Sequence, residues 1–191
     1  MMILDSMIHQ VSLDTVRLKL VWLLLPVLLC LAAPSLLSLL LGVIVGLFGL
    51  GIRLWAAGYI DKLNKLTTRG PYAYTRNPLY LGTLVIGLGF AIAASKVSLV
   101  LVCLAFFYFV YLPKVRQEAT ELEKKFGDQY LGYAQMVRLI LPAVKPYRDS
   151  LSEGRSCCFS LRRYLLNREW EALLTASFVF GLLFLKFFFW K

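Results

Sequence analysis

A long stretch without charge constrains this chain more than any other feature of its sequence. From Leu20 to Ile52 no side chain is charged, and this run is longer than the roughly 20 residues that one membrane-spanning helix needs. Hydrophobic residues make up 59% of the 191 positions and charged residues only 17%. This balance argues against a water-soluble globular domain. The sequence therefore predicts an all-α, polytopic membrane protein.

Breaks within the apolar runs predict about five membrane-spanning helices. Pro34 lies near the middle of the first run and divides it into two spans, the second ending near Tyr59. Leu79–Tyr111 is long enough for a helical hairpin that turns near Lys96. A fifth span is expected over Ala172–Trp190, whose aromatic and basic end is typical of a membrane interface.

The charge distribution predicts an orientation. Lys and Arg total 21 against 11 for Asp and Glu, and the excess lies in Asp61–Arg76 and Lys114–Arg168. Basic loops between spans follow the positive-inside rule, so the charge requires no nucleic acid to explain it. We expect both segments, and the helices between spans four and five, in the cytoplasm. The N-terminus is then inside and the C-terminus outside, with membrane lipids as contacts and no nucleic-acid partner.

Four regions follow from this pattern. They are residues 1–60 with the first two spans, 61–142 with a motif loop, the hairpin and cytoplasmic helices, 143–168 as a basic linker, and 169–191 as the C-terminal span. Asp5 and Asp14 precede an apolar run longer than that of a signal peptide, so no cleavage is expected. Adjacent Cys157 and Cys158 lack the spacing of a metal site, and we expect all four thiols to be reduced.

Glycines recur in the second and third spans, where small residues let helices approach closely. The second span contains Gly42, Gly46, Gly49 and Gly51, and the third contains Gly82, Gly87 and Gly89. Helix packing is the simpler interpretation. The alternative is that Gly87 and Gly89 leave room for a ligand against the backbone.

The first motif surrounds the start of the third span. Pro78 suits the first turn of a helix and Asn77 suits its N-cap. Flanked by Arg76 and Tyr80, this helix start is either a site for a carboxylate or another anion, or a cap with interfacial aromatic residues. Arg53, at the end of an uncharged span, either orients a carboxylate or extends to the interface.

The second motif is an amphipathic helix that follows the fourth span. Its apolar face consists of residues at helical spacing, Val115, Ala119, Leu122 and Phe126. Glu118 flanks this face and can point back toward the bundle, where it would accept hydrogen bonds from an ammonium group. Glu121 and Lys125 are four residues apart and form a favourable surface pair.

Together these motifs resemble a known family, the isoprenylcysteine carboxyl methyltransferases and related phospholipid methyltransferases. Its Gly-Pro-Tyr and Arg-His-Pro-x-Tyr-x-Gly signatures are similar to Gly70-Pro71-Tyr72 and Arg76-Asn77-Pro78-Leu79-Tyr80-Leu81-Gly82. Its Glu-Glu-x-x-Leu-x-x-x-Phe-Gly-x-x-Tyr-x-x-Tyr region is similar to the block that starts at Glu118 and continues through Tyr133. The resemblance extends roughly from Arg53 to Pro142, about half of the chain.

The resemblance implies a site for S-adenosyl-L-methionine and a lipophilic acceptor that enters from the bilayer. It assigns the cofactor pocket to the first motif, with Tyr72, Asn77, Pro78, Tyr80 and Gly82. Glu118, together with Glu121, would bind the amino group of the cofactor. Arg76 and Arg53 are the predicted catalytic residues, because a guanidinium can orient a carboxylate in two-point contact. No metal is required.

Two departures from the family pattern affect the mechanism. Asn77 replaces a histidine, and an amide cannot act as a general base at neutral pH. Ala119 replaces a second glutamate, so Glu118 carries more of the expected contact with an ammonium group.

Other classes of function are also compatible with the sequence. A sterol-type reductase would share the membrane plan but use NADPH, whereas a helical scaffold or transporter would bind neither cofactor. The acceptor is a lipophilic small molecule or a prenylated substrate, with a prenylcysteine-like carboxylate, an amine headgroup and other amphiphiles all compatible. The sequence does not define the oligomeric state.

Overall fold

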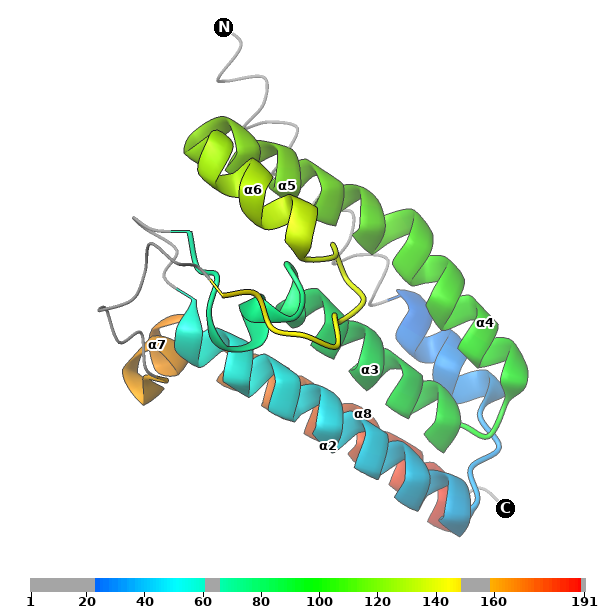
Figure 1. Cartoon of the computed structure of the whole chain (residues 1–191). Coiled ribbons are helices and arrows are strands. Elements are labelled where there is room, and N and C mark those ends of the chain that lie inside the picture. The colour runs from blue at the N-terminus through cyan, green and yellow to red at the C-terminus, as the bar shows by residue number, and fades with distance from the viewer. Residues whose placement is uncertain (1–22, 61–65, 149–158, 190–191) are drawn as a thin grey trace, which may run out of the picture.

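A computed structural model describes residues 23–60, 66–148 and 159–189, and within these ranges all regular structure is helical (Figure 1). The expected all-α fold is therefore confirmed. The chain forms α2 (Leu36–Tyr59), the 3₁₀ turn η1 (Gly70–Ala73), α3 (Pro78–Ala93), α4 (Val97–Phe106), the π-helical turn η2 (Phe107–Tyr111), α5 (Leu112–Phe126), α6 (Asp128–Met136), α7 (Leu161–Leu166) and α8 (Trp170–Phe189). Residues 23–31 are also helical.

Three of the described helices are long and apolar enough to cross a membrane: Leu36–Tyr59, Val97–Phe126 and Trp170–Phe189. These helices are those of an integral membrane protein. α3 is apolar but has only 16 residues, or about 24 Å at 1.5 Å per residue, which is short of the hydrocarbon core. Five full spans are therefore not established. Both termini, Asp5, Asp14, Cys157 and Cys158 lie outside the described ranges. The orientation of the termini therefore stays a prediction.

The predicted break near Pro34 is confirmed. Helical residues end at position 31, and Ser35 caps the start of α2. The backbone N–H of Ser38 donates to Ser35 Oγ at 3.1 Å, and the Ser35 N–H donates to Ser38 Oγ at 2.9 Å. Ser38 Oγ also donates to the carbonyl of Ala93 at 3.1 Å. The first turn of α2 is thereby joined to the last turn of α3.

Glycines make the crossing of α2 and α3 unusually close. A Cβ placed on Gly49 would lie 2.8 Å from the carbonyl oxygen of Gly82, and one on Gly42 would lie 2.5 Å from that of Gly89. Since real Cβ atoms do not approach a backbone oxygen this closely, only glycine allows this contact. The packing interpretation holds for these four residues. Gly87 differs, because it lines a cavity.

The expected hairpin is also present. α3 ends at Ala93, Ser95 adopts a positive φ of 58°, and Lys96 precedes α4. The returning helix runs without a break from Val97 to Phe126. Pro113 lies within this helix, directly after the wider turn η2, which accommodates a residue without an N–H.

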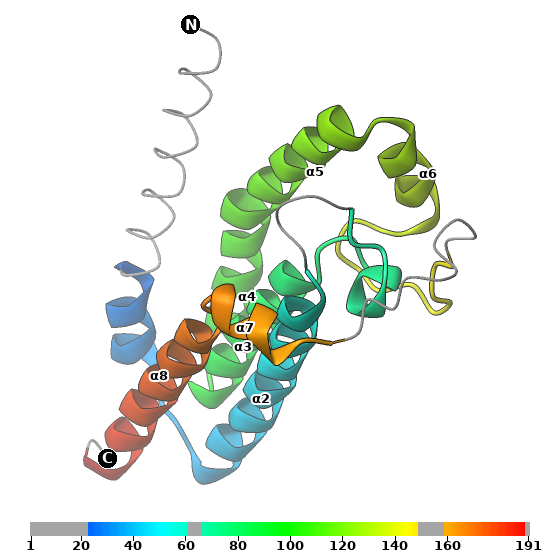
Figure 2. The same cartoon turned by 90° about the vertical axis from the view of Figure 1, so that its left-hand side faces the viewer.

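A polar cap lies beyond one end of the bundle; it comprises residues 66–77, α6 and residues 137–148 (Figure 2). Its two chain segments are joined by backbone hydrogen bonds, from Ala143 N–H to Tyr74 O at 2.7 Å and from Tyr147 N–H to Ala73 O at 2.9 Å. Its core is an aromatic and aliphatic cluster formed by Tyr130, Tyr133 and Val137 with Ala119, Leu122 and Phe126 of α5. The predicted apolar face of α5 therefore packs as expected, with Val115 buried and Ala119, Leu122 and Phe126 partly buried against the cap.

α8 packs on the other side of the bundle. It lies beside α2 and beside the helical residues 23–31 (Figure 2). The ring of Phe180 contacts Phe90 at a centroid distance of 4.9 Å, and Gly46 leaves the space that this ring occupies. Lys186 Nζ donates to the carbonyl oxygen of Leu29, so the last charged residue of the span satisfies the end of a neighbouring helix.

Candidate functional site

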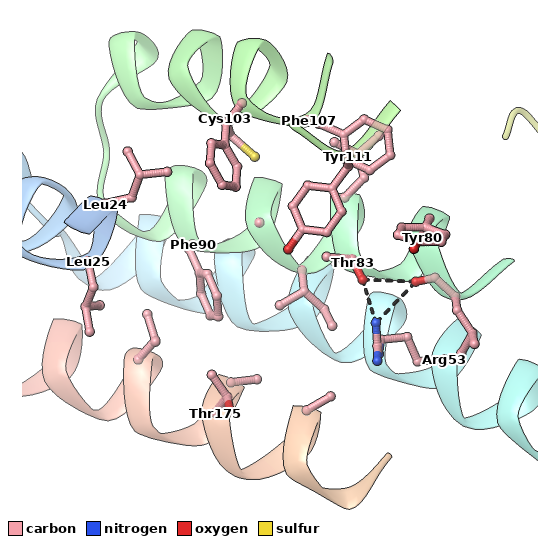
Figure 3. A pocket seen from close by; sticks show the side chains of 18 of the residues that line it. Leu24, Leu25, Arg53, Tyr80, Thr83, Phe90, Cys103, Phe107, Tyr111 and Thr175 are labelled. Atoms are coloured by element: carbon pink, nitrogen blue, oxygen red, sulfur yellow. Dashed lines mark hydrogen bonds between the residues drawn. The ribbon is translucent and has the colours of Figure 1, made fainter. Parts of the chain in front are cut away.

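A cavity of about 900 Å³ lies among the helices. It is bounded by residues 24–28, by Arg53 of α2, by one face of α3, by α4 and η2, by Glu118 of α5 and by residues 167–179 (Figure 3). This volume falls within the usual range for small-molecule and cofactor sites.

Polarity changes along the cavity. Tyr80, Thr83 and Arg53 lie at one end, whereas Leu24, Leu25 and Phe90 lie at the other (Figure 3). On α3 alone the lining extends from Tyr80 to Ala91, which corresponds to about 16 Å at 1.5 Å per residue. The cavity thus has one polar end and an apolar body, the form expected of a site for an amphiphile.

The polar end brings the two sequence motifs together. Tyr80 Oη of the first motif donates to Glu118 Oε1 of the second motif at 2.6 Å, although the residues are 38 positions apart. Both side chains line the cavity. A short hydrogen bond to a carboxylate fixes the orientation of the acid. The structure therefore places Glu118 where a ligand in the cavity can meet it.

Arg53 is bound from two sides. Its Nη1 donates to Thr83 Oγ1 at 2.5 Å and to the Leu79 carbonyl at 3.3 Å, while Nη2 pairs with Glu169 Oε2 at 2.5 Å. The side chains of Arg53 and Glu169 are only 20% and 9% exposed. Neither of the two sequence interpretations of Arg53 included this ion pair. Thr83 and Glu169 are residues that the sequence reasoning missed.

Gly82 and Pro78 lie beside the cavity and do not line it. A Cβ on Gly82 would lie 2.6 Å from Cγ of Arg53 and 2.8 Å from the Gly49 carbonyl oxygen. The absence of a side chain at Gly82 therefore leaves room for the side chain of Arg53 to cross α3. Pro78 is the first residue of α3 and is buried, in agreement with its predicted place in the first turn.

Asn77 holds the N-cap position but does not cap the helix with its side chain. Its Nδ2 donates instead to the carbonyl of Leu139 at 3.0 Å. An amide suffices for this bond, so the absence of the family's histidine does not remove this tie between α3 and the polar cap.

Arg76 also faces the polar cap. Its backbone N–H donates to the Arg138 carbonyl at 3.0 Å, and its Nη1 donates to Tyr130 Oη at 3.1 Å. Arg76 and Asn77 are absent from the cavity lining. Of the two predicted catalytic arginines, only Arg53 lies at the cavity.

Tyr72 contributes a buried hydroxyl. Its carbonyl accepts a hydrogen bond from Tyr133 Oη at 2.6 Å, but its own Oη has no hydrogen-bond partner among the described residues. Burial, then the neighbouring Tyr133 and Glu169, raise the pKa of Tyr72 above its ordinary value, although Arg53 lowers it. The group is therefore a neutral donor at physiological pH. Buried polar groups without a partner are uncommon. Tyr72 is not part of the cavity lining, although the charges of Arg53 and Glu169 at the polar end act on its hydroxyl.

Glu121 lies apart from these groups. It is exposed and accepts a hydrogen bond from Gln117 Nε2 at 3.1 Å, one turn earlier on α5. It is not part of the cavity lining. In the described part of the chain, no cluster of three or more histidine, cysteine or acidic side chains could hold a metal ion.

Residues 27–129 match the family model described as phospholipid methyltransferase. The chain belongs to this family. The match confirms the resemblance drawn from the two motifs, and it contains both Tyr80 and Glu118. It ends before α7 and α8.

Two curated proteins are similar to part of this chain. The chain is 34% identical over 119 residues to the cobalt-zinc-cadmium resistance protein CzcN of Cupriavidus metallidurans, covering 61% of this chain and 53% of that protein. It is 29% identical over 111 residues to the nickel-cobalt-cadmium resistance protein NccN of Alcaligenes xylosoxydans xylosoxydans, covering 55% and 52%. The match thus spans about half the length of these relatives. No solved structure matches the chain.

Proposed function

We propose that this membrane protein uses S-adenosyl-L-methionine to methylate a lipophilic acceptor bound in the cavity. One observation carries the proposal beyond the family assignment. Tyr80 and Glu118, which come from the two family motifs, form a 2.6 Å hydrogen bond at the polar end of an otherwise apolar cavity. This arrangement combines a fixed acid with space for a hydrocarbon chain.

The residues present are suited to the methyl donor. The Glu118 carboxylate can accept hydrogen bonds from an ammonium group, and the neutral Tyr72 hydroxyl is a buried donor without a partner among the described residues. When bound, the donor supplies a methyl group already activated on a sulfonium. The protein residues then act mainly by holding the reactants in place and by excluding water.

The acceptor end is assigned to Arg53. This residue lines the cavity, whereas Arg76 faces Tyr130 in the polar cap. Since Glu169 already balances the charge of Arg53, a carboxylate acceptor would meet a guanidinium that is held in place and partly neutralised. The proposed acceptors are lipophilic small molecules or prenylated compounds, and a carboxylate is one of the head groups that fits.

The proposal is tested by incubating membrane lipid extracts with the purified protein and a donor labelled in its methyl group. Mass spectrometry should find the label in a lipid product, and that product names the acceptor class. Glu118→Gln should remove the product. Glu123→Gln, an exposed acid on the same helix, should retain it. If no lipid carries the label after incubation with the wild-type protein, the proposal is contradicted.

Cofactor stabilisation separates the alternatives. A ligand that binds the folded state raises the unfolding temperature, and the stabilisation grows with the logarithm of the ligand concentration relative to its dissociation constant. We expect S-adenosyl-L-methionine to stabilise the protein and NADPH not to do so. The reverse result would favour a reductase, and stabilisation by neither would favour a scaffold or transporter.

A further inference from the structure

The last helix forms one wall of the cavity, although it lies outside the family match. The match ends at residue 129, whereas α8 begins at Trp170. Six α8 residues line the cavity: Glu171, Ala172, Thr175, Ala176, Phe178 and Val179. Figure 3 shows Thr175 of α8 across the cavity from Cys103 of α4. The region shared with the family therefore does not by itself enclose the cavity.

The inner face of α8 follows helical spacing. Ala172, Ala176, Val179 and Leu183 recur every three or four residues, and the last three are 1%, 6% and 0% exposed. Toward the polar end, Ala172, Thr175 and Ala176 are small side chains of α8 that line the cavity. Larger side chains at these positions would occupy the cavity, so their size limits the width available to a ligand.

α8 is fixed to the bundle at both ends. At the polar end, Glu169 pairs with Arg53, and Asn167 Nδ2 donates to the Ala57 carbonyl at 3.1 Å. At the apolar end, Lys186 binds the carbonyl oxygen of Leu29. Of these three contacts, the one from Glu169, the residue before α8, involves a side chain that also lines the polar end of the cavity, Arg53. Breaking a poorly exposed ion pair of this kind leaves an uncompensated charge and is costly.

We propose that α8 is the wall that selects the hydrocarbon part of the acceptor, and that Glu169 is a positioning residue that holds this wall in place through Arg53. The statement that this hydrocarbon chain belongs to a methyl acceptor rests on the proposed function. The statement that a hydrocarbon chain lies against α8 does not rest on it, and this contact can be measured without methyl transfer.

The wall is tested with a palmitic acid that carries a diazirine on its chain, using the full-length protein in phosphatidylcholine nanodiscs. After illumination, mass spectrometry measures labelling at Cys103, inside the cavity, relative to Leu101, which is 63% exposed. In the wild-type protein we expect clear labelling of Cys103. Thr175→Leu should reduce it about tenfold relative to Leu101, because a larger side chain fills the cavity.

Ser177→Leu is the matched control. Ser177 is exposed on the same helix and does not line the cavity, since it lies about 200° around the helix axis from Thr175. The same enlargement there should change cavity labelling less than twofold. Equal labelling in the two variants, or wild-type labelling confined to Leu101, would overturn the proposal.

The positioning role is tested with Glu169→Gln and Glu169→Asp. The Gln variant should lose at least fivefold in cavity labelling, while the unfolding temperature confirms a folded protein. The Asp variant, which keeps the charge, should recover at least half of the labelling. Wild-type labelling in Glu169→Gln would overturn the role of Glu169.

The two hypotheses fail separately. Cavity labelling that responds to Thr175→Leu in a protein that binds no S-adenosyl-L-methionine would remove the proposed function and leave α8 as a selective wall. If the protein binds S-adenosyl-L-methionine but Thr175→Leu leaves the cavity labelling unchanged, α8 is not a selective wall and the proposed function stands.

Discussion

At the scale of single residues, the hydrogen bond between Tyr80 and Glu118 organises the polar end of the cavity. The hydroxyl lies 2.6 Å from the carboxylate oxygen, and the tyrosine ring contacts Tyr111 edge to face at 6.0 Å. A phenol fixed by its ring therefore orients an acid that faces the cavity. Hydrogen bonds to charged groups contribute about 1.5–3 kcal/mol.

Tyr80→Phe tests this orientation. The variant keeps the ring and loses the donor to Glu118, so S-adenosyl-L-methionine should bind about tenfold more weakly. Calorimetric titration measures the affinity. Tyr108→Phe is the matched control, because Tyr108 is 58% exposed and lies away from the cavity. Equal affinities for the two variants would show that the Tyr80 hydroxyl does not prepare the site.

Tyr72→Phe tests the buried hydroxyl. Because this group has no partner among the described residues, its removal should leave the free energy of unfolding unchanged or raise it by about 1 kcal/mol or less. The stabilisation by saturating S-adenosyl-L-methionine should decrease, since a ligand is the expected partner. Thermal unfolding with and without ligand measures both quantities. A less stable variant with full ligand stabilisation would contradict the assignment.

Residue positions were more predictable than side-chain partners. Proline and asparagine preferences placed Asn77 and Pro78 correctly at the start of α3. The actual bond of Asn77 goes to Leu139, 62 positions later. Arg53 likewise meets Glu169 across 116 positions. Local propensities carry no information about such partners, which depend on how the helices assemble.

At the scale of elements, the closest contact is the crossing of α2 and α3. Without a hydrophobic driving force between helices in lipid, close backbone approach supplies the packing energy. Gly49 and Gly82 meet at this crossing. The same contact lets Arg53 pass Gly82 toward Thr83, so the packing of two helices also positions the site.

Gly49→Ala should destabilise the protein. The new Cβ would lie 2.8 Å from the Gly82 carbonyl oxygen and 2.9 Å from the Ile86 nitrogen, so the backbones must separate. Overpacking of this kind costs about 1–3 kcal/mol. Gly51→Ala is the control, because its Cβ would meet nothing within 4 Å. Unfolding in the same detergent measures both, and equal stability would contradict the close crossing.

Elements were predicted well where a single physical signal fixes them. Pro34 with the Ser35 cap defines the start of α2, and the apolar periodicity of α5 correctly identified its buried face. The number of spans was less predictable. α3 is a short apolar helix, and hydropathy does not determine whether such a helix crosses a bilayer.

At the scale of the whole molecule, the cavity joins the region that the family model matches with the C-terminal segment that lies outside the match. The family region contributes α3, α4 and Glu118, whereas the C-terminal segment contributes α8 as a wall and Glu169, the residue before α8, as the partner of Arg53. The family motifs supply Tyr80 and Glu118 of the polar end. They contain no information on α8, so the enclosure of the cavity became apparent only from the fold.

We propose that the polar end of this cavity binds S-adenosyl-L-methionine through Glu118. Calorimetric titration of this compound into the wild-type protein, Glu118→Gln and Glu123→Gln in the same nanodiscs measures this binding. We predict saturable binding to the wild-type and Glu123→Gln proteins and at least 30-fold weaker binding to Glu118→Gln. Wild-type affinity in Glu118→Gln, or no binding to the wild-type protein, would contradict the account.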